Sequence, residues 1–257
     1  MEKEGKIKLK GNFVYCYPIL EDNKNSFIKK VASLNNERKC LIELRLDYLL
    51  YAGFSIDDII KIINYIKAHV SSKKLIATIR TVSEGGKVDL PKEKYFTYIK
   101  ELYLNSKVNY IDVEYKFYKI DKVYYDSLFK KKKKKIILSM HIFDRIFFEN
   151  EYMNIFTEMA ESSGNLVKFA IKTYTKEDLF TFMVTARNSI KVMKKNRKDA
   201  IFIAMGTVGA LSRLLPEYTN TKIVFLNAYK DIDTELGQMN REKYVKYRKL
   251  LAKISEN

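Results

Sequence analysis

Short apolar segments rich in β-branched residues alternate with longer amphipathic segments along the chain. Apolar runs of about four to eight residues are typical of buried strands, and apolar side chains at helical spacing are typical of helices. The predicted strands are residues 13–18, 40–47, 75–80, 110–114, 136–141, 166–171, 200–205 and 223–226. The predicted helices are residues 25–34, 56–69, 92–106, 118–131, 145–162, 176–195, 209–217 and 241–254.

Eight strands that alternate with eight helices predict a (β/α)8 TIM barrel, an α/β fold whose strands are all parallel. A doubly wound open sheet has a similar alternation, but no GxGxxG-like segment follows the first predicted strand. No linker rich in Pro, Gly or Ser divides the 257 residues. We therefore predict a single catalytic barrel domain over residues 1–257.

Charged residues occupy the faces of the predicted strands that point to the barrel axis. Side chains alternate along a strand, so one face meets the helices and the other meets the axis. In residues 40–47 the apolar outer face leaves Glu43, Arg45 and Asp47 pointing inward. The same rule gives inward positions to Arg80, Asp112, Glu114, His141 and Lys168.

This set of buried charges points to an active site. Burial of an unpaired charge costs several kcal/mol, so the groups either neutralise one another as internal ion pairs or take part in chemistry. Several of them fall near the carboxyl ends of their strands, which is the end of a TIM barrel that carries catalytic residues. The sequence therefore favours an active site over a purely structural set of ion pairs.

A lysine and a histidine in one site favour imine chemistry. An uncharged amine attacks a ketone to form an imine, which makes a proton on the adjacent carbon removable. Histidine is suited to take this proton and to return it. Of the two histidines, His69 falls in a charged amphipathic helix and is expected at the surface, which leaves His141 as the base.

Metal, cofactor and membrane functions find little support in the sequence. It contains no HxH or HExxH motif, no cysteine pair at metal-ligand spacing and no Walker loop, so we expect neither a metal nor a cofactor. No apolar run approaches the roughly 20 residues of a membrane span, and the first residues do not resemble a signal peptide. Cys16 and Cys40 fall in predicted core strands as buried thiols, which favours a cytoplasmic protein.

The net charge of +17 raises the possibility of a nucleic-acid partner. However, the basic residues are spread over the chain, and only residues 130–135 form a continuous basic run. The aromatic residues show no pattern of a stacking platform. We expect no nucleic-acid partner and interpret the charge as a compositional bias of the whole chain, whose positive field also helps to attract an anionic substrate.

Six segments along the chain read, in order, ELRLD, TIRTVSEGG, IDVE, SMH, VKFAI and AMGTVGALSR. Together they resemble the type I 3-dehydroquinate dehydratases, and the resemblance runs along nearly the whole chain. Each motif alone is weak, but their order and spacing are specific. Three departures are Val167, where the family usually has proline before its lysine, Met140, where asparagine is common, and residues 234–238, which read TELGQ in place of the common SAPGQ.

The resemblance implies a role for each matched residue. Lys168 would form a Schiff base with the C3 ketone of 3-dehydroquinate, His141 would move a proton from C2 to the departing C1 hydroxyl, and Glu84 would orient His141. Arg213 would bind the substrate carboxylate. Further substrate contacts would come from Glu43, Arg45, Arg80, Met205, Phe225, Thr234 and Gln238. Asp47, Asp112 and Glu114 would support this layer from behind.

The family also implies a homodimer and a place in the shikimate pathway. Glu235 puts a negative charge beside the mouth that an anionic substrate must enter, so the closing loop is expected to be a weakened lid. Two alternatives remain open: another Schiff-base barrel enzyme such as an aldolase, and a barrel with reduced activity.

Overall fold

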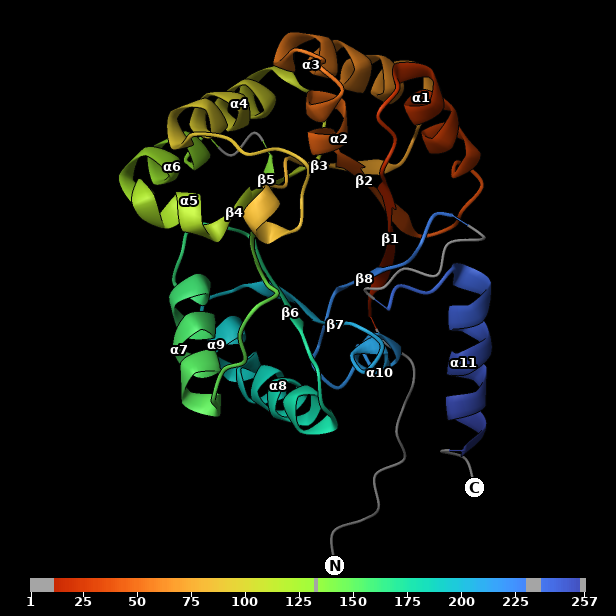
Figure 1. Ribbon diagram of the computed structural model, residues 1–257, viewed down its shortest axis with the longest axis vertical. Helices are drawn as coiled ribbons and strands as arrows, with labels where there is room; N and C mark the ends of the chain where they lie inside the picture. Colours follow the sequence, from red (N-terminus) through yellow and green to blue (C-terminus); the bar gives the residue numbers. More distant parts are fainter. Residues whose placement is uncertain (1–11, 132–133, 230–236, 255–257) are drawn as a thin grey trace, which may run out of the picture.

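Eight parallel strands form a nearly closed barrel surrounded by helices (Figure 1). The computed structural model describes residues 12–131, 134–229 and 237–254. The strands are β1 (Val14–Ile19), β2 (Cys40–Arg45), β3 (Lys74–Thr78), β4 (Tyr110–Glu114), β5 (Lys135–Ile142), β6 (Leu166–Lys172), β7 (Asp199–Met205) and β8 (Ile223–Phe225). From β1 to β7, each strand pairs with its neighbour in the chain, and β8 pairs with β1. The predicted (β/α)8 barrel is confirmed.

The barrel closes between β7 and β8 through a short contact. Within the described residues, a single bridge joins Ala200 to Thr221, just before β8 begins. The Lys222 amide donates to the Ala200 carbonyl oxygen at 2.9 Å, and the Val14 amide donates to the Lys222 carbonyl oxygen at 3.0 Å. Residues 221–222 therefore bridge β7 to β1 where β8 is too short to pair with β7.

The helices lie outside the strands, with short ones at the strand ends. Before β4 they are α1 (Lys24–Ser33), α2 (Leu46–Tyr51), α3 (Ile56–Tyr65) with its extension Ile66–Val70, the turn η2 (Val82–Glu84) and α4 (Lys92–Asn105). After β4 they are α5 (Tyr115–Ile120), α6 (Lys122–Phe129), α7 (Glu149–Ala160), α8 (Lys176–Asn188), α9 (Ile190–Lys195), α10 (Ala210–Leu214) and α11 (Arg241–Ile254).

The strand side chains alternate between two apolar layers. Ile42 and Leu44 of β2 face outward and are fully buried beneath the helices, as are Val113 of β4 and Phe169 of β6. The inward residues of the strands form a second cluster inside the barrel, which includes Ile137 of β5. Both layers remove apolar surface from water, and this burial is the main favourable term in folding.

Two predicted boundaries were wrong in ways that affect the site. The second strand ends at Arg45 rather than at residue 47, because the chain turns there into α2. The third strand ends at Thr78, so Arg80 lies beyond it. The predicted helix 118–131 is two helices that meet at Asp121, whose extended φ of −139° ends α5 and whose carboxylate caps α6.

Two smaller expectations were confirmed. Cys16 and Cys40 are buried free thiols. His69 is exposed, and its ring stacks on Tyr65 at 4.7 Å between centroids. Over the described ranges, no helix combines the length and apolarity that a bilayer crossing needs.

Candidate active site

A cavity of about 170 Å³ opens at the carboxyl ends of the strands. This volume suits a small molecule, since drug-sized ligands occupy roughly 300–1,000 Å³. The residues that line it are Pro18, Leu20, Glu43, Arg45, Tyr48, Arg80, Glu84, Gly85, His141, Phe143, Lys168, Ala170, Ile203, Met205, Arg213, Phe225 and Gln238. Ten of the eleven residues predicted for catalysis or direct substrate contact therefore lie around one cavity, and the eleventh is Thr234.

Lys168 projects from β6 into this cavity and is only 4% exposed. Its neighbours Val167 and Phe169 are buried in the outer layer, so the Lys168 side chain between them points to the inside of the barrel. The ammonium Nζ lies 3.1 Å from Glu43 Oε1 and 3.3 Å from Asp112 Oδ2. The same atom lies 4.3 Å above the centre of the Phe225 ring. Two carboxylates and an aromatic face thus hold the amine in place.

Arg80 joins the acidic residues of β4 to Glu84 of the turn η2 and to Ser139 of β5. Its Nη2 donates to Asp112 Oδ1 at 2.6 Å, and its Nη1 donates to Ser139 Oγ at 2.9 Å and to Glu84 Oε2 at 3.1 Å. Glu114 Oε1 lies 3.4 Å from Nη1. Burial alone would lower the pKa of Arg80, but these carboxylates raise it well above its usual range. Arg80 is therefore a permanent cation at the centre of the charged cluster.

Asp112 is fully buried between two cations. Burial alone would raise its pKa, but Arg80 and Lys168 outweigh burial, with help from the Ser139 hydroxyl. The result is a lowered pKa, so Asp112 is ionised at neutral pH. Its two oxygens are divided between the two cations, which ties Lys168 to the Arg80 network.

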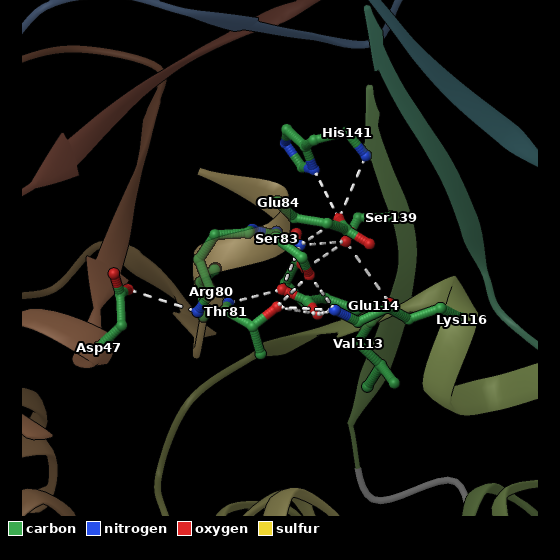
Figure 2. Close-up of polar contacts among 12 residues, drawn as sticks. Asp47, Arg80, Thr81, Ser83, Glu84, Val113, Glu114, Lys116, Ser139 and His141 are labelled. Carbon is green, nitrogen blue, oxygen red and sulfur yellow. Dashed lines mark hydrogen bonds and ion pairs between the residues drawn. The ribbon is translucent and has the colours of Figure 1, made fainter. Parts of the chain in front are cut away.

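His141 and Glu84 form a hydrogen-bonded pair (Figure 2). Glu84 Oε2 lies 3.1 Å from His141 Nδ1 and accepts from the His141 backbone N–H at 3.1 Å. Burial, together with the cations of Arg80 and Lys168, lowers the pKa of His141 well below its usual value. The imidazole is therefore neutral near pH 7 and has a nitrogen lone pair for a proton. Burial raises the pKa of Glu84 to about 8, although Arg80 opposes this.

Two glycines allow Glu84 to reach His141. Glu84 ends η2, and Gly85 follows it with a left-handed φ of 81°. At Gly86 an added Cβ would lie 1.8 Å from the Arg80 carbonyl oxygen, so no larger residue fits. The chain thus folds back on itself directly after Arg80, and the EGG segment is a fixed turn rather than a flexible loop.

Arg45 lines the cavity from the end of β2, braced by Asp47. The Arg45 Nε and Nη2 each donate to an Asp47 oxygen at 2.8 Å, which is a bidentate pair. Asp47 also accepts from the backbone N–H of Arg80 at 3.4 Å and of Lys87 at 3.2 Å. The prediction that Asp47 continues the inward face of the strand was wrong. Asp47 lies in α2 instead, because the turn after Arg45 lets its carboxylate tie together three segments of chain.

Arg213, Met205 and Gln238 reach the cavity from the other side. Arg213 lies in α10 and is 6% exposed, and burial lowers its pKa to about 10, so it remains a cation at neutral pH. Met205 ends β7. Gln238 comes from the segment before α11. Thr234 and Glu235 lie outside the described residues.

Glu114 supports Arg80 and the following turn rather than His141. It accepts from the Thr81 backbone N–H at 2.7 Å and from the Thr81 hydroxyl at 2.8 Å. Lys116 Nζ lies 3.2 Å from Glu114 Oε2, the oxygen that also accepts from the Thr81 hydroxyl. Across the described ranges, no hydrogen bond joins Glu114 to His141. Tyr48, Thr81, Lys116 and Ser139 complete the site without having been predicted, although Ser139 shares the inward face of its strand with His141.

Within the part of the chain that the structure describes, no three His, Cys, Asp or Glu side chains gather as metal ligands. The carboxylates of the site face Arg80, Arg45 and Lys168 instead. Each of these carboxylates is therefore paired with an arginine or lysine side chain.

The fold and cavity define a (β/α)8-barrel enzyme with a buried lysine beside a histidine–carboxylate pair. The chain belongs to the type I 3-dehydroquinase family, whose family model matches residues 15–254. The resemblance inferred from the motifs is thereby confirmed.

Named relatives agree with this membership over nearly the whole chain. The chain is 31% identical to the 3-dehydroquinate dehydratase of Streptococcus suis (strain 98HAH33) over 241 residues. The aligned region covers 91% of this chain and 97% of that protein. The crystal structure of type I 3-dehydroquinate dehydratase from Clostridium difficile, with covalently modified comenic acid, superposes with a TM-score of 0.83 at 25% identity and covers 95% of this chain and 94% of that one. The 3-dehydroquinate dehydratase of Enterococcus faecalis has the same fold, with a TM-score of 0.78 at 20% identity over 94% of this chain and 95% of that one.

Proposed function

We propose that the protein dehydrates 3-dehydroquinate to 3-dehydroshikimate, a step of the shikimate pathway, through a Schiff base on Lys168. One observation carries the proposal: Lys168, His141 and Arg213 line the same small cavity. They supply an amine for a ketone, a base for a carbon acid and a planar cation for a carboxylate. The covalently modified comenic acid in the Clostridium difficile relative adds support for covalent chemistry in this family.

Imine formation is the first step. The Lys168 ammonium gives one proton to a neighbouring carboxylate, and the amine adds to the C3 carbonyl of the substrate to form a carbinolamine. The same proton then returns to the carbinolamine hydroxyl, which leaves as water, so that an iminium remains. Glu43 and Asp112, which contact Nζ in the free protein, face the new cation and stabilise it. The Phe225 ring beside Nζ keeps bulk water away from the bond.

Elimination is the second step. The neutral imidazole of His141 takes the proton from C2, and the electrons of that bond enter the iminium to give an enamine. His141 then returns the proton to the C1 hydroxyl, which leaves as water while the enamine becomes a conjugated iminium. Hydrolysis of this iminium releases the product and restores Lys168. The net reaction is the loss of one water from the substrate.

The remaining residues bind and orient the substrate. Arg213 binds the carboxylate with its planar fork. Glu43, Arg45, Arg80, Thr234 and Gln238 hold the ring hydroxyls, and Met205 and Phe225 form apolar walls. Glu84 orients His141 through the Nδ1 contact. Asp47, Asp112 and Glu114 brace these groups from behind. We further propose that the protein acts without a cofactor, as a cytoplasmic homodimer.

Two measurements test the proposal. Purified protein mixed with 3-dehydroquinate should give a rising ultraviolet absorbance from the conjugated enone product. Borohydride reduction in the presence of substrate should add mass to the peptide that carries Lys168.

Lys172 provides the matched control for this labelling. It also lies on β6, near the ring of Tyr174 at 5.3 Å. Labelling should survive in Lys172→Met and vanish in Lys168→Met. Labelling of Lys172, or no absorbance change with wild-type protein, would overturn the assignment.

A further inference from the structure

Lys116 lies outside the cavity and hydrogen-bonds to the turn that contains Glu84 (Figure 2). It lies in α5, directly after β4, and does not line the cavity. Its ammonium donates to the Thr81 hydroxyl at 2.8 Å and lies 3.2 Å from Glu114 Oε2. It also donates to the Ser83 hydroxyl. Two of these partners, Thr81 and Ser83, lie three residues and one residue before Glu84 in the chain.

Glu114 completes the same attachment. It accepts from both the backbone N–H and the hydroxyl of Thr81, so three hydrogen bonds join the start of the turn to β4 and α5. The turn itself is short, because Gly85 and Gly86 reverse the chain at once. A displacement of Thr81 or Ser83 is therefore expected to displace the Glu84 carboxylate as well.

We propose that Lys116 is a positioning residue that sets the placement and charge of Glu84 against His141. The proposal rests on the proposed function, in which the Glu84 carboxylate orients His141 for proton transfer. Lys116 acts through the turn and through its charge, and it touches neither substrate nor His141.

The charges around Glu84 give the direction of the electrostatic effect. Arg80 and Lys116 are the cations near Glu84, whereas Glu114 and Asp112 are anions that disfavour a second negative charge. His141 contacts the carboxylate directly. Loss of the Lys116 charge leaves the anions less compensated, so Glu84 should hold its proton to higher pH. Less of the pair is then in the form that orients the imidazole at neutral pH.

The experiment compares three variants of the full chain. Lys116→Met keeps the length of the side chain and removes its charge. Lys116→Arg keeps the charge and the donors. Lys119→Met is the matched control, because Lys119 lies on the same helix but pairs with Glu158, away from the turn.

Activity is the first readout. In Lys116→Met we expect kcat at pH 7 to fall about tenfold with KM changed less than about twofold, because orientation of the base and not binding is lost. The acid limb of the kcat profile should move up by about 0.5–1 pH unit. Lys116→Arg should recover kcat to within about threefold, and Lys119→Met should match the wild type.

The second readout does not depend on turnover. The chain has two histidines, so the ring signals of His69 and His141 are readily separated by NMR on isotopically labelled protein. Titration of Glu84 moves the His141 signal, and its midpoint should rise in Lys116→Met alone. An unchanged midpoint, or an equal rise in Lys119→Met, overturns the proposal. Wild-type protein that shows the midpoint but no turnover contradicts the proposed function instead.

Discussion

The two halves of the barrel interior differ sharply at the cavity. On the side of β2 to β5 the inward groups are Glu43, Arg80, Asp112, Glu114 and Ser139, joined by short hydrogen bonds. On the side of β6 to β8 and β1, the inward groups near the cavity include Ala170, Ile203, Met205, Phe225 and Cys16. Lys168 belongs to the apolar half by sequence, but its amine reaches across to the carboxylates of the other half.

This contrast separates two physical tasks. In the charged half each group has a direction set by its partners, so geometry is fixed before substrate arrives. The apolar half excludes water, which strengthens each electrostatic interaction across the cavity because the local dielectric constant is low. A reacting group placed between the halves therefore has both a fixed position and a dry environment. The contrast predicts that substitutions in the two halves have effects of very different size.

The largest effect should follow from removing the group that joins the halves. Lys168→Met should lower kcat on the order of 10⁴–10⁶-fold, because the covalent step is lost. Lys172→Met serves as the control and should retain most activity. Circular dichroism would establish that both variants fold. Substantial turnover by Lys168→Met would contradict the covalent route.

The next effect should come from the proton shuttle at the border of the charged half. His141→Ala should slow elimination by about 10²–10⁴-fold, the usual range for a general acid–base group. Imine formation is a separate step, so borohydride should still trap substrate on this variant. Near-normal turnover would assign the proton transfer to Glu84 or to water.

A substitution of Arg213 tests whether substrate binding can be weakened without slowing the chemical step. Arg213→Lys keeps a positive charge but loses the planar fork, so KM should rise about tenfold while kcat changes less. Steady-state kinetics with 3-dehydroquinate measures both constants. An unchanged KM would place the substrate carboxylate at Arg45 or Arg80.

Glu84 should make stability depend on pH. Burial raises its pKa from 4.5 to about 8, so between these values the folded protein binds more protons than the unfolded chain. The unfolding free energy should therefore fall as pH rises through this range, by at most about 1.4 kcal/mol per pH unit. Urea denaturation of Glu84→Gln at several pH values should show a flatter dependence. The exposed Glu177→Gln on α8 should keep the wild-type slope.

The smallest effect should come from the apolar half. Met205→Leu conserves volume in the inner cluster, so the unfolding free energy should change by less than about 1.5 kcal/mol. The kcat should stay within about threefold, since this wall excludes water without fixed hydrogen bonds. A large loss of kcat with little change in stability would show that the apolar wall also orients the substrate.

The alternation rule predicted the parts of the site that depend on local chain geometry. Glu43, Asp112, His141 and Lys168 lie on inward faces because side chains alternate within a strand, and this needs no knowledge of loops. The strand ends were predicted wrongly at Asp47 and Arg80, because the direction of the chain there depends on α2 and on the turn at Gly85, although Arg80 does line the cavity.

Lys116 was missed for a different reason. Its partners Thr81 and Ser83 are more than thirty residues away in sequence, and nothing local distinguishes this lysine from the other basic residues. Such contacts arise only when neighbouring strands of the barrel bring their loops together.

The short β8 strand has a consequence for how the protein assembles. Seven strands can pair in the order in which they emerge along the chain, because each lies beside its sequence neighbour. Joining β1 to β8 is different, since the paired residues Val14 and Ile223 are separated by nearly the whole chain, and such long-range closure is slow. Phe225, which packs beneath the Lys168 amine, belongs to β8. We therefore expect the lysine to be exposed to water in a nascent barrel and to gain its dry surroundings only when the two ends of the chain meet.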